Sequence, residues 1–227
     1  MSENNPPLPL YEDPSIRERF DAAARKMQQQ FWDNKAADWD GRRNAQGLQP
    51  HHIERMAPWL TDPVLLVGAG RGMILQALRA AGYAASGVDW SANMVAEAQR
   101  DGIIGLDRGD AGQLPHDNQS LATVIISTGV LLPTHTRDRR EAYLGEARRI
   151  LMPTGRLILC LLFDEGSTKA RLAAENVQLP IHTIHAQVHW ELGPVGASLS
   201  RLGFHSLDQI KQDNVLIWSL AKTSTQS

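Results

Sequence analysis

The stretch LLVGAGRGM, residues 65–73, decides the fold of this chain. Apolar residues run up to Val67, and glycines then occupy positions 68, 70 and 72, at every second place. A short apolar run followed by glycine indicates a buried strand that turns sharply into a helix. Glycine has no β-carbon and adopts backbone angles closed to other residues, so a ligand can come close to such a loop. The free N–H groups at the start of the next helix would face that ligand.

Further apolar runs alternate with amphipathic segments along the chain. The runs cover residues 63–67, 84–89, 121–127, 155–163 and 214–222. Between them, helices are expected over 72–82, over 92–100 with Ser91 as the N-cap, and over 137–151, ending at the turn MPTG, residues 152–155. Continuous apolar strands separated by helices indicate a parallel sheet covered on both faces. The sequence therefore predicts an α/β doubly wound domain that binds ligands beyond the carboxyl ends of its strands.

Composition limits the classes of function. The chain of 227 residues suits one domain, and its formal net charge of -2 offers no bulk positive field for a nucleic acid. The single cysteine, Cys160, lies in an apolar run, which indicates an inert buried thiol rather than a disulfide. Residues 1–14, MSENNPPLPLYEDP, lack the pattern of a signal peptide, and no apolar run reaches membrane-spanning length. A cytoplasmic protein with no membrane partner is expected.

Polar residues follow two of the later strands. Asp89 ends the second apolar run, where a carboxylate can accept hydrogen bonds from both hydroxyls of a ribose. Trp90 could lie against adenine or belong to the core, and the sequence favours neither. Asp110, in the loop RGDAGQLP at 108–115, could accept a hydrogen bond from the exocyclic amine of adenine. These features together point to an adenosine-containing ligand.

The order of these parts resembles the class I S-adenosylmethionine-dependent methyltransferases, particularly the small-molecule branch (methyltransferase type 11/25-like). The resemblance is clear over residues 31–163 and weaker over 198–222. It implies a Rossmann-like, mostly parallel sheet of seven strands and S-adenosylmethionine as the cofactor. It also implies a division into a flexible arm (1–14) and one methyltransferase domain (15–227), which comprises a helical lid (15–60), a cofactor-binding core (61–163), a substrate-side insertion (164–192) and a C-terminal helix with strands (193–227).

The resemblance also implies a cofactor site drawn from several loops. It places Gly68, Ala69, Gly70 and Gly72 at the methionine part, Asp89 at the ribose, Trp90 and Met94 beside adenine, Asp110 and Ala111 at the adenine edge, Ser127, Thr128 and Gly129 near the sulfonium, and Trp39, in the lid segment FWDNKAADWD, over the cofactor. One position departs from the family pattern: Leu66 stands where an acidic residue is usual. Recognition of the amino group of the cofactor must then come from elsewhere.

The implied reaction is in-line transfer of a methyl group to an O, N or S nucleophile of a small molecule, in which the protein mainly supplies alignment and a dry site. A catalytic base is not required in every case. His135 is a candidate base, although a solvated residue at a helix start is slightly favoured. The candidates for the substrate pocket are Trp32, His135, His182, His185 and His189, and scattered surface histidines are the commonest alternative. No metal is expected, because the histidines lack cysteine or acidic ligands at a motif spacing.

Three other functions remain open on the sequence. An NAD-dependent oxidoreductase also uses a glycine loop and an acidic strand end, but its third glycine would fall at position 73, which is Met73. A non-catalytic cofactor-binding or sensor protein of the same fold is suggested by Leu66 and by the absence of an evident base. An RNA methyltransferase is disfavoured by the charge of the chain.

Overall fold

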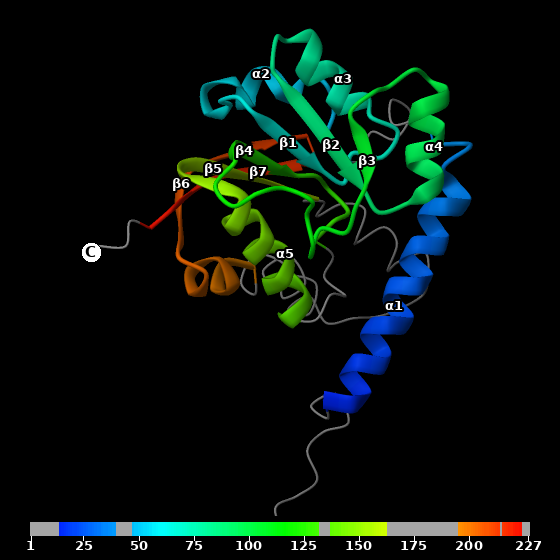
Figure 1. Ribbon diagram of the computed structural model, residues 1–227. Helices are drawn as coiled ribbons and strands as arrows, with labels where there is room; N and C mark the ends of the chain where they lie inside the picture. Colours follow the sequence, from blue (N-terminus) through cyan, green and yellow to red (C-terminus); the bar gives the residue numbers. More distant parts are fainter. Residues whose placement is uncertain (1–13, 40–46, 132–136, 163–194, 214, 224–227) are drawn as a thin grey trace, which may run out of the picture.

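The computed structural model describes residues 14–39, 47–131, 137–162, 195–213 and 215–223. A seven-stranded sheet with helices packed on its faces forms the centre of the molecule (Figure 1). The strands are β1 (Val64–Val67), β2 (Ala85–Asp89), β3 (Leu106–Arg108), β4 (Leu121–Ile126), β5 (Leu151–Leu162), β6 (Phe204–Gln212) and β7 (Val215–Lys222). Their order across the sheet is β3-β2-β1-β4-β5-β7-β6, and only the pairings of β7 are antiparallel. The predicted α/β, mostly parallel Rossmann-like fold is confirmed.

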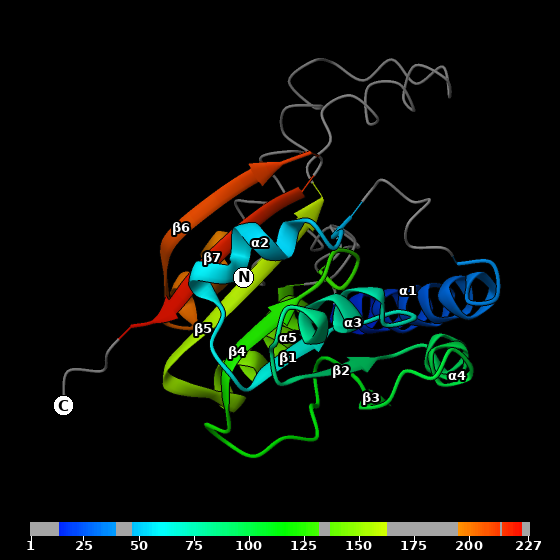
Figure 2. The same cartoon turned by 90° about the horizontal axis from the view of Figure 1, so that it is seen from above.

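The helices connect and cover these strands. They are α1 (Pro14–Lys35), α2 (His52–Met56), a 3₁₀ helix (Ala57–Trp59), α3 (Met73–Ala80), α4 (Ala92–Arg100) and α5 (Arg137–Ile150), and residues 195–201 are also helical. The predicted N-cap is confirmed, because the Oγ of Ser91 accepts a hydrogen bond from the backbone N of Met94 at 3.1 Å. Helix α1 lies beside α4 in both views (Figures 1 and 2), and Asn93 Nδ2 donates to the carbonyl of Asp33 at 3.1 Å.

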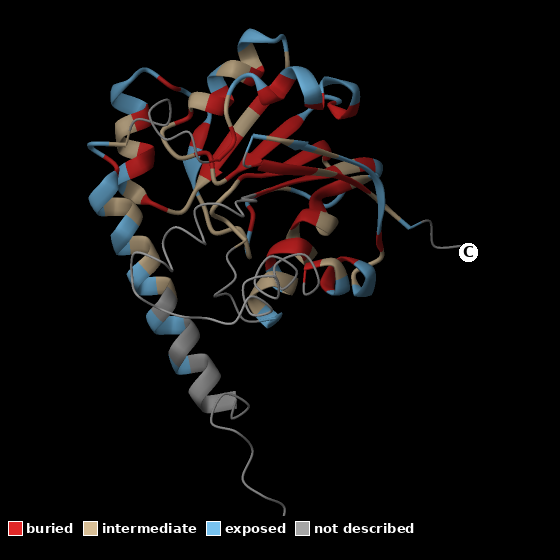
Figure 3. Cartoon of the chain, turned by 180° about the vertical axis from the view of Figure 1, so that it is seen from behind, coloured by how far each residue is buried: buried red, intermediate tan, exposed pale blue. Residues whose placement is uncertain are grey.

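Both faces of the sheet are buried at β1 and β4, which explains why these strands read as continuous apolar runs, whereas β6 is mostly exposed. Val64 and Leu66 of β1 pack into one hydrophobic cluster with α2, α3 and α4, whereas Leu65 and Val67 pack into a second cluster with α5. Figure 3 shows the centre of the sheet as mostly buried. Cys160 of β5 is buried as predicted, and burial raises the pKa of its thiol.

One element differs from its prediction. Residues 152–155 were expected to form a turn after α5, and this expectation is wrong because they belong to β5. Leu151 already pairs with Leu121 of β4, and pairing resumes between Arg156 and Thr123, so the segment forms an irregularity within a strand. In the part of the chain that the structure describes, no helix has the length and apolar character needed to cross a membrane.

Candidate functional site

A pocket lies beyond the carboxyl ends of β1, β2 and β4, and α1 contributes to its wall. It gathers most of the residues expected at the cofactor: Trp39, Gly68, Ala69, Gly70, Asp89, Trp90, Met94, Asp110, Ala111, Ser127, Thr128 and Gly129. Trp32, expected in the substrate pocket, lines the same cavity. Residues from loops far apart in the sequence are thus brought together at the edge of the sheet where parallel α/β folds bind ligands.

The glycine loop leaves β1 with its backbone turned toward the pocket. Gly68 and Gly70 have φ angles of 76° and 54°, which residues with a β-carbon rarely adopt. A β-carbon on Gly68 would lie 2.2 Å from Cγ2 of Val130. The backbone N–H groups of Gly68 and Ala69 both donate to the carbonyl of Val88, at 2.9 and 3.1 Å, and this anchors the loop to β2. Close packing and positive φ therefore both require glycine at position 68.

Asp89 stands at the end of β2 and is tied to the glycine loop. Its Oδ2 accepts the backbone N–H of Gly70 at 2.7 Å, and its Oδ1 accepts that of Ser91 at 2.9 Å. Burial raises the pKa of the Asp89 carboxyl, although the bonds from Ser91 and Gly70 oppose that shift. An ionised carboxylate has about four acceptor positions. Asp89 can therefore hold the loop and still accept further hydrogen bonds from a ligand.

Trp90, Met94, Asp110 and Tyr143 also line the pocket. Asp110 Oδ1 accepts the backbone N–H of Gly112 at 2.8 Å, which fixes the carboxylate on its loop. Tyr143 of α5 is buried, and it also lines the pocket. Burial, with a smaller effect of Asp110, raises the pKa of the Tyr143 hydroxyl. A flat apolar ligand with a polar edge fits these surroundings.

Helix α1 covers the pocket through contacts that the sequence did not predict. The guanidinium of Arg25 lies 4.5 Å from the centre of the Trp90 ring and forms an ion pair with Asp110. Gln28 Nε2 donates to the carbonyl of Gly129 at 3.2 Å. No periodic pattern marks such long polar side chains in advance, because each contact joins residues far apart in the chain.

Two aromatic residues and Arg71 complete the cover. The rings of Trp32 and Trp39 meet edge to face with centroids 5.1 Å apart. Arg71, between two loop glycines, donates to the carbonyl of Ala37 at 3.2 Å and pairs with Asp101 at 2.6 Å. The side chain of Arg71 thus provides a hydrogen-bond donor for the carbonyl of Ala37, just beyond the end of α1. Arg71 is a functional candidate that sequence reasoning missed.

Gly72 and Leu66 depart from the family pattern, the first in its position and the second in its residue type. Gly72 does not line the pocket: it is buried, and a β-carbon there would meet the Ile103 side chain at 2.9 Å. Its φ of 82° also favours glycine, so its role is close packing at the start of α3. Leu66 does line the pocket and is fully buried. The pocket therefore has an aliphatic side chain where the family pattern has an acidic one.

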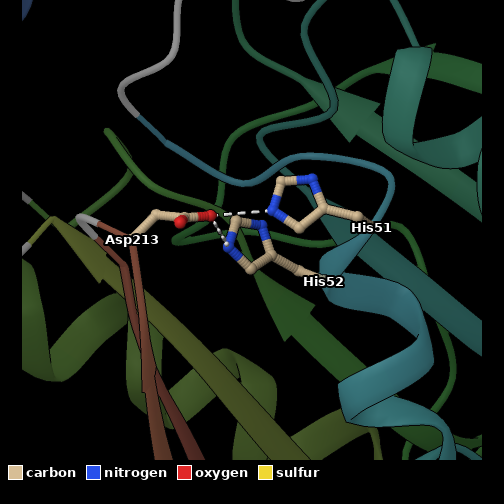
Figure 4. Close-up of side chains that lie close together, drawn as sticks. All are labelled: His51, His52 and Asp213. Carbon is tan, nitrogen blue, oxygen red and sulfur yellow. Dashed lines mark hydrogen bonds and ion pairs between the residues drawn. The ribbon is translucent and has the colours of Figure 1, made fainter.

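The remaining candidate residues, His135, His182, His185 and His189, lie outside the described residues. A different histidine group appears at the turn between β6 and β7, where His51 and His52 face Asp213 (Figure 4). The Oδ2 of Asp213 lies 2.8 Å from Nε2 of His51 and 3.5 Å from Nε2 of His52. Nothing in the sequence marks this group in advance, because Asp213 is remote in the chain from the histidine pair.

The bonding of His52 decides what this group can do. Its Nδ1 accepts the backbone N–H of Gln49 at 2.9 Å, so the proton of a neutral ring lies on Nε2, facing Asp213. A metal at Nε2 would need the lone pair of that nitrogen, and metal-bound histidines normally donate from the other nitrogen. The contacts therefore favour a polar cluster, in which only His51 is hydrogen-bonded to Asp213, over a metal site. Burial and the neighbouring His51 lower the pKa of His52, although Asp213 opposes the shift.

Comparison with known proteins agrees with this geometry. Residues 64–155, which run from β1 into β5, match a family model described as a methyltransferase domain. No curated protein matches the chain. The matched segment contains the glycine loop, Asp89 and Asp110.

Solved structures share the fold at low sequence identity. One, from work on conversion of a disulfide bond into a thioacetal group during echinomycin biosynthesis, is 20% identical with a TM-score of 0.61, covering 80% of this chain and 84% of that chain. The glycopeptide N-methyltransferase MtfA, in complex with S-adenosylmethionine, is 16% identical with a TM-score of 0.58, covering 77% and 87%. A SAM-dependent methyltransferase from Methanosarcina mazei is 15% identical with a TM-score of 0.58, covering 74% and 96%.

Proposed function

We propose that this chain, whose residues 64–155 form a methyltransferase domain of the class I S-adenosylmethionine-dependent family, transfers a methyl group from that cofactor to a small-molecule nucleophile. The family consists of enzymes, and S-adenosylmethionine is their methyl donor. One observation carries the proposal for this chain: the bare backbone of the glycine loop and the carboxylate of Asp89 face one pocket, joined by the bond from Gly70. That pairing suits a ribose carrying a substituent that lies against the loop.

The remaining pocket residues suit the other parts of the cofactor. Asp89 would accept hydrogen bonds from the two ribose hydroxyls, and Trp90 and Asp110 would bind the face and the amine of adenine. The glycine loop would hold the methionine part, and Thr128, just after β4, would lie near the sulfonium. Support for this placement comes from the sheet order: Asp110 follows β3 and Asp89 ends the neighbouring strand β2, so the residues assigned to adenine and to ribose are adjacent, as those two groups are in the cofactor.

The amino group of the cofactor requires a partner other than residue 66. Leu66 is apolar and fully buried, so it accepts no hydrogen bond from an ammonium group. Three side-chain amides line the pocket and offer neutral oxygen acceptors: Gln28, Gln29 and Gln49. We infer that these amides and backbone carbonyls replace the usual carboxylate.

The chain contributes alignment and exclusion of water. S-adenosylmethionine supplies an activated methyl group, which an in-line nucleophile takes while the carbon–sulfur electron pair returns to sulfur. Trp32 and Trp39 cover the pocket and keep water from the reacting centre. The glycine loop and Asp89 fix the donor in one orientation, so a correctly placed acceptor meets the methyl carbon in line. No described residue has to remove a proton when the acceptor is already a free nucleophile.

A small acceptor is favoured over a macromolecule for two reasons. The net charge of -2 gives little attraction for a nucleic acid, and α1 lies across the pocket, which restricts access for a large partner. One structural neighbour is a glycopeptide N-methyltransferase, which is consistent with a small acceptor. A single, buried cysteine fits the cytoplasmic location that we also propose.

Calorimetry with three ligands tests the proposed function. The chain is expected to bind S-adenosylmethionine and S-adenosylhomocysteine but not NAD. Binding of NAD alone would replace the proposal with an oxidoreductase. Incubation with S-adenosylmethionine labelled in its methyl group, together with a panel of small phenols, amines and thiols, then separates an enzyme from a cofactor sensor by the label recovered on an acceptor.

A further inference from the structure

Arg25 of α1 contacts both residues that are proposed to receive adenine. Its guanidinium lies 4.5 Å from the centre of the Trp90 ring, and its Nη2 pairs with Oδ2 of Asp110. The two paired side chains are about equally shielded, with 29% and 31% of their surfaces exposed. The contact therefore lies at the mouth of the pocket, where both partners still meet solvent.

The position of Arg25 conflicts with that of a stacked base. Aromatic rings stack with their centres about 4.5–7 Å apart, and the guanidinium already lies at such a distance over one face of Trp90. The same guanidinium engages the polar edge of the subsite. Oδ1 of Asp110 already holds Gly112, so Oδ2 is the oxygen left for a ligand, and Arg25 is paired with it.

We propose that Arg25 is an affinity-determining residue of the cofactor site, because adenine has to displace its guanidinium from Trp90 and from Asp110 Oδ2. This inference rests on the proposed function, since it concerns the adenine subsite. Binding of the cofactor is then an exchange: the adenine ring replaces the guanidinium over Trp90, and the exocyclic amine replaces Nη2 at the carboxylate. Arg25 lowers the apparent affinity by the free energy of the contacts that are given up.

The expected effect is modest because the contacts are partly exposed. A surface ion pair and an exposed cation–π contact together contribute about 1 kcal/mol, which corresponds to about a fivefold change in Kd. The other possibility is that Arg25 stays in place and packs against the bound cofactor. Removing the guanidinium would then weaken binding, so the two roles of Arg25 predict changes of opposite sign.

The test compares Arg25→Met with wild type by calorimetric titration of S-adenosylhomocysteine. Methionine keeps an unbranched apolar stem but removes the charge and the planar head. We expect Arg25→Met to bind about fivefold more tightly and Arg25→Lys to fall between it and wild type. Arg19→Met, at an exposed position on the same helix, serves as the matched control and should bind as wild type does. Thermal unfolding of each variant verifies that it is folded.

The possible outcomes separate this inference from the proposed function. Tighter binding by Arg25→Met, with Arg19→Met unchanged, supports the exchange. Equal or weaker binding by Arg25→Met, while wild type binds well, overturns the role of Arg25 and leaves the cofactor site in place. Absence of binding by wild type and all variants overturns the proposed function itself.

Discussion

The backbone N–H of Gly70 donates to Oδ2 of Asp89 at 2.7 Å, so the glycine loop and the end of β2 are joined directly. Ser91 holds the other oxygen of the same carboxylate at 2.9 Å. The two bonds fix the direction of the Asp89 side chain into the pocket before any ligand arrives. A site whose parts are already oriented loses less conformational freedom on binding.

Removing the Asp89 carboxylate should weaken cofactor binding strongly. Asp89→Ala is expected to reduce the affinity for S-adenosylhomocysteine by about 2 kcal/mol, or roughly thirtyfold, because ribose hydroxyls lose their acceptor in a half-buried site. Asp89→Asn, which keeps one side-chain oxygen, should lose less. Calorimetric titration of both variants measures the effect, and unchanged binding in Asp89→Ala would remove this residue from its assigned role.

On acidification, cofactor affinity should begin to fall at a higher pH than it would if Asp89 had the pKa of an unperturbed aspartate. Burial raises the pKa of Asp89, and ribose hydroxyls donate best to its ionised form. Affinity is therefore fully present above the raised pKa and declines as the pH falls through it, at a pH above the ~3.9 of an unperturbed aspartate. Titrations of S-adenosylhomocysteine across the acid range measure this decline. Asp89→Asn should bind weakly and lack it.

The centre of the sheet could be predicted because β1 and β4 are buried on both faces. Strands buried on both faces require apolar residues at successive positions, which gives runs such as 63–67 and 121–127. Strand β3 gave a weaker signal, since only Leu106 of its three residues is buried. The segment 152–155 was misassigned because Pro153 and Gly155 are typical of turns. Pairing with β4 on both sides of the segment keeps it in a strand, and that pairing has no local signature.

Some residues of the site could be predicted from their local sequence, and others could not because their partners are distant in the chain. Gly68 and Asp89 could be predicted because a positive φ and a strand end impose residue types locally. Arg25, Arg71 and Asp213 act through contacts with residues distant in the chain, and nothing in their neighbouring sequence specifies the partner. The sequence therefore predicted the floor of the pocket better than its cover.

Position 68 should accept alanine with less loss of stability when the side chain of Val130 is shortened. Gly68→Ala combines a φ of 76° with a β-carbon 2.2 Å from Val130, so we expect a loss of about 2 kcal/mol or more in unfolding free energy. Val130→Ala in the same chain removes the clash and should recover the steric part, leaving the cost of the φ angle. Urea denaturation measures each step.

A matched control for this pair lies on α5. A β-carbon on Gly145 meets nothing within 4 Å, and the residue is helical, so Gly145→Ala should stabilise the chain by about 0.5–1 kcal/mol. If Gly68→Ala were equally harmless, the loop would be adaptable, and the requirement for glycine at that position would be disproved.

Buried His52 should make the fold sensitive to mild acid. Burial lowers its pKa, so the unfolded chain takes up the proton first, and stability is lost as the pH falls below the ~6.5 of an unperturbed histidine. His116, whose pKa is also lowered by burial, acts in the same direction. His52→Gln should therefore be less stable at neutral pH but show a flatter decline between neutral and mildly acid pH. Thermal unfolding across that range is the measurement, and an unaltered slope would contradict the assignment.

Leu66 should limit how well the chain distinguishes ligands that carry an amino acid. The side chain of Leu66 cannot bind an ammonium group. The affinity for S-adenosylhomocysteine should therefore be only modestly higher than that for 5′-methylthioadenosine, which lacks the amino-acid part. Leu66→Asp places a carboxylate on the pocket wall and should raise the ratio of the two affinities about tenfold, or ~1.4 kcal/mol, as for a charge-assisted hydrogen bond.

The variant at position 66 carries a cost in stability, because the residue is fully buried in the core cluster. Both ligands are therefore measured well below the unfolding temperature, so that the ratio of affinities reports binding alone. Leu66→Asn is the matched control: it has nearly the same shape as aspartate without the charge and should change the ratio little. If Leu66→Asp and Leu66→Asn give the same ratio as wild type, position 66 does not face the amino group, and the departure from the family pattern has no effect on recognition.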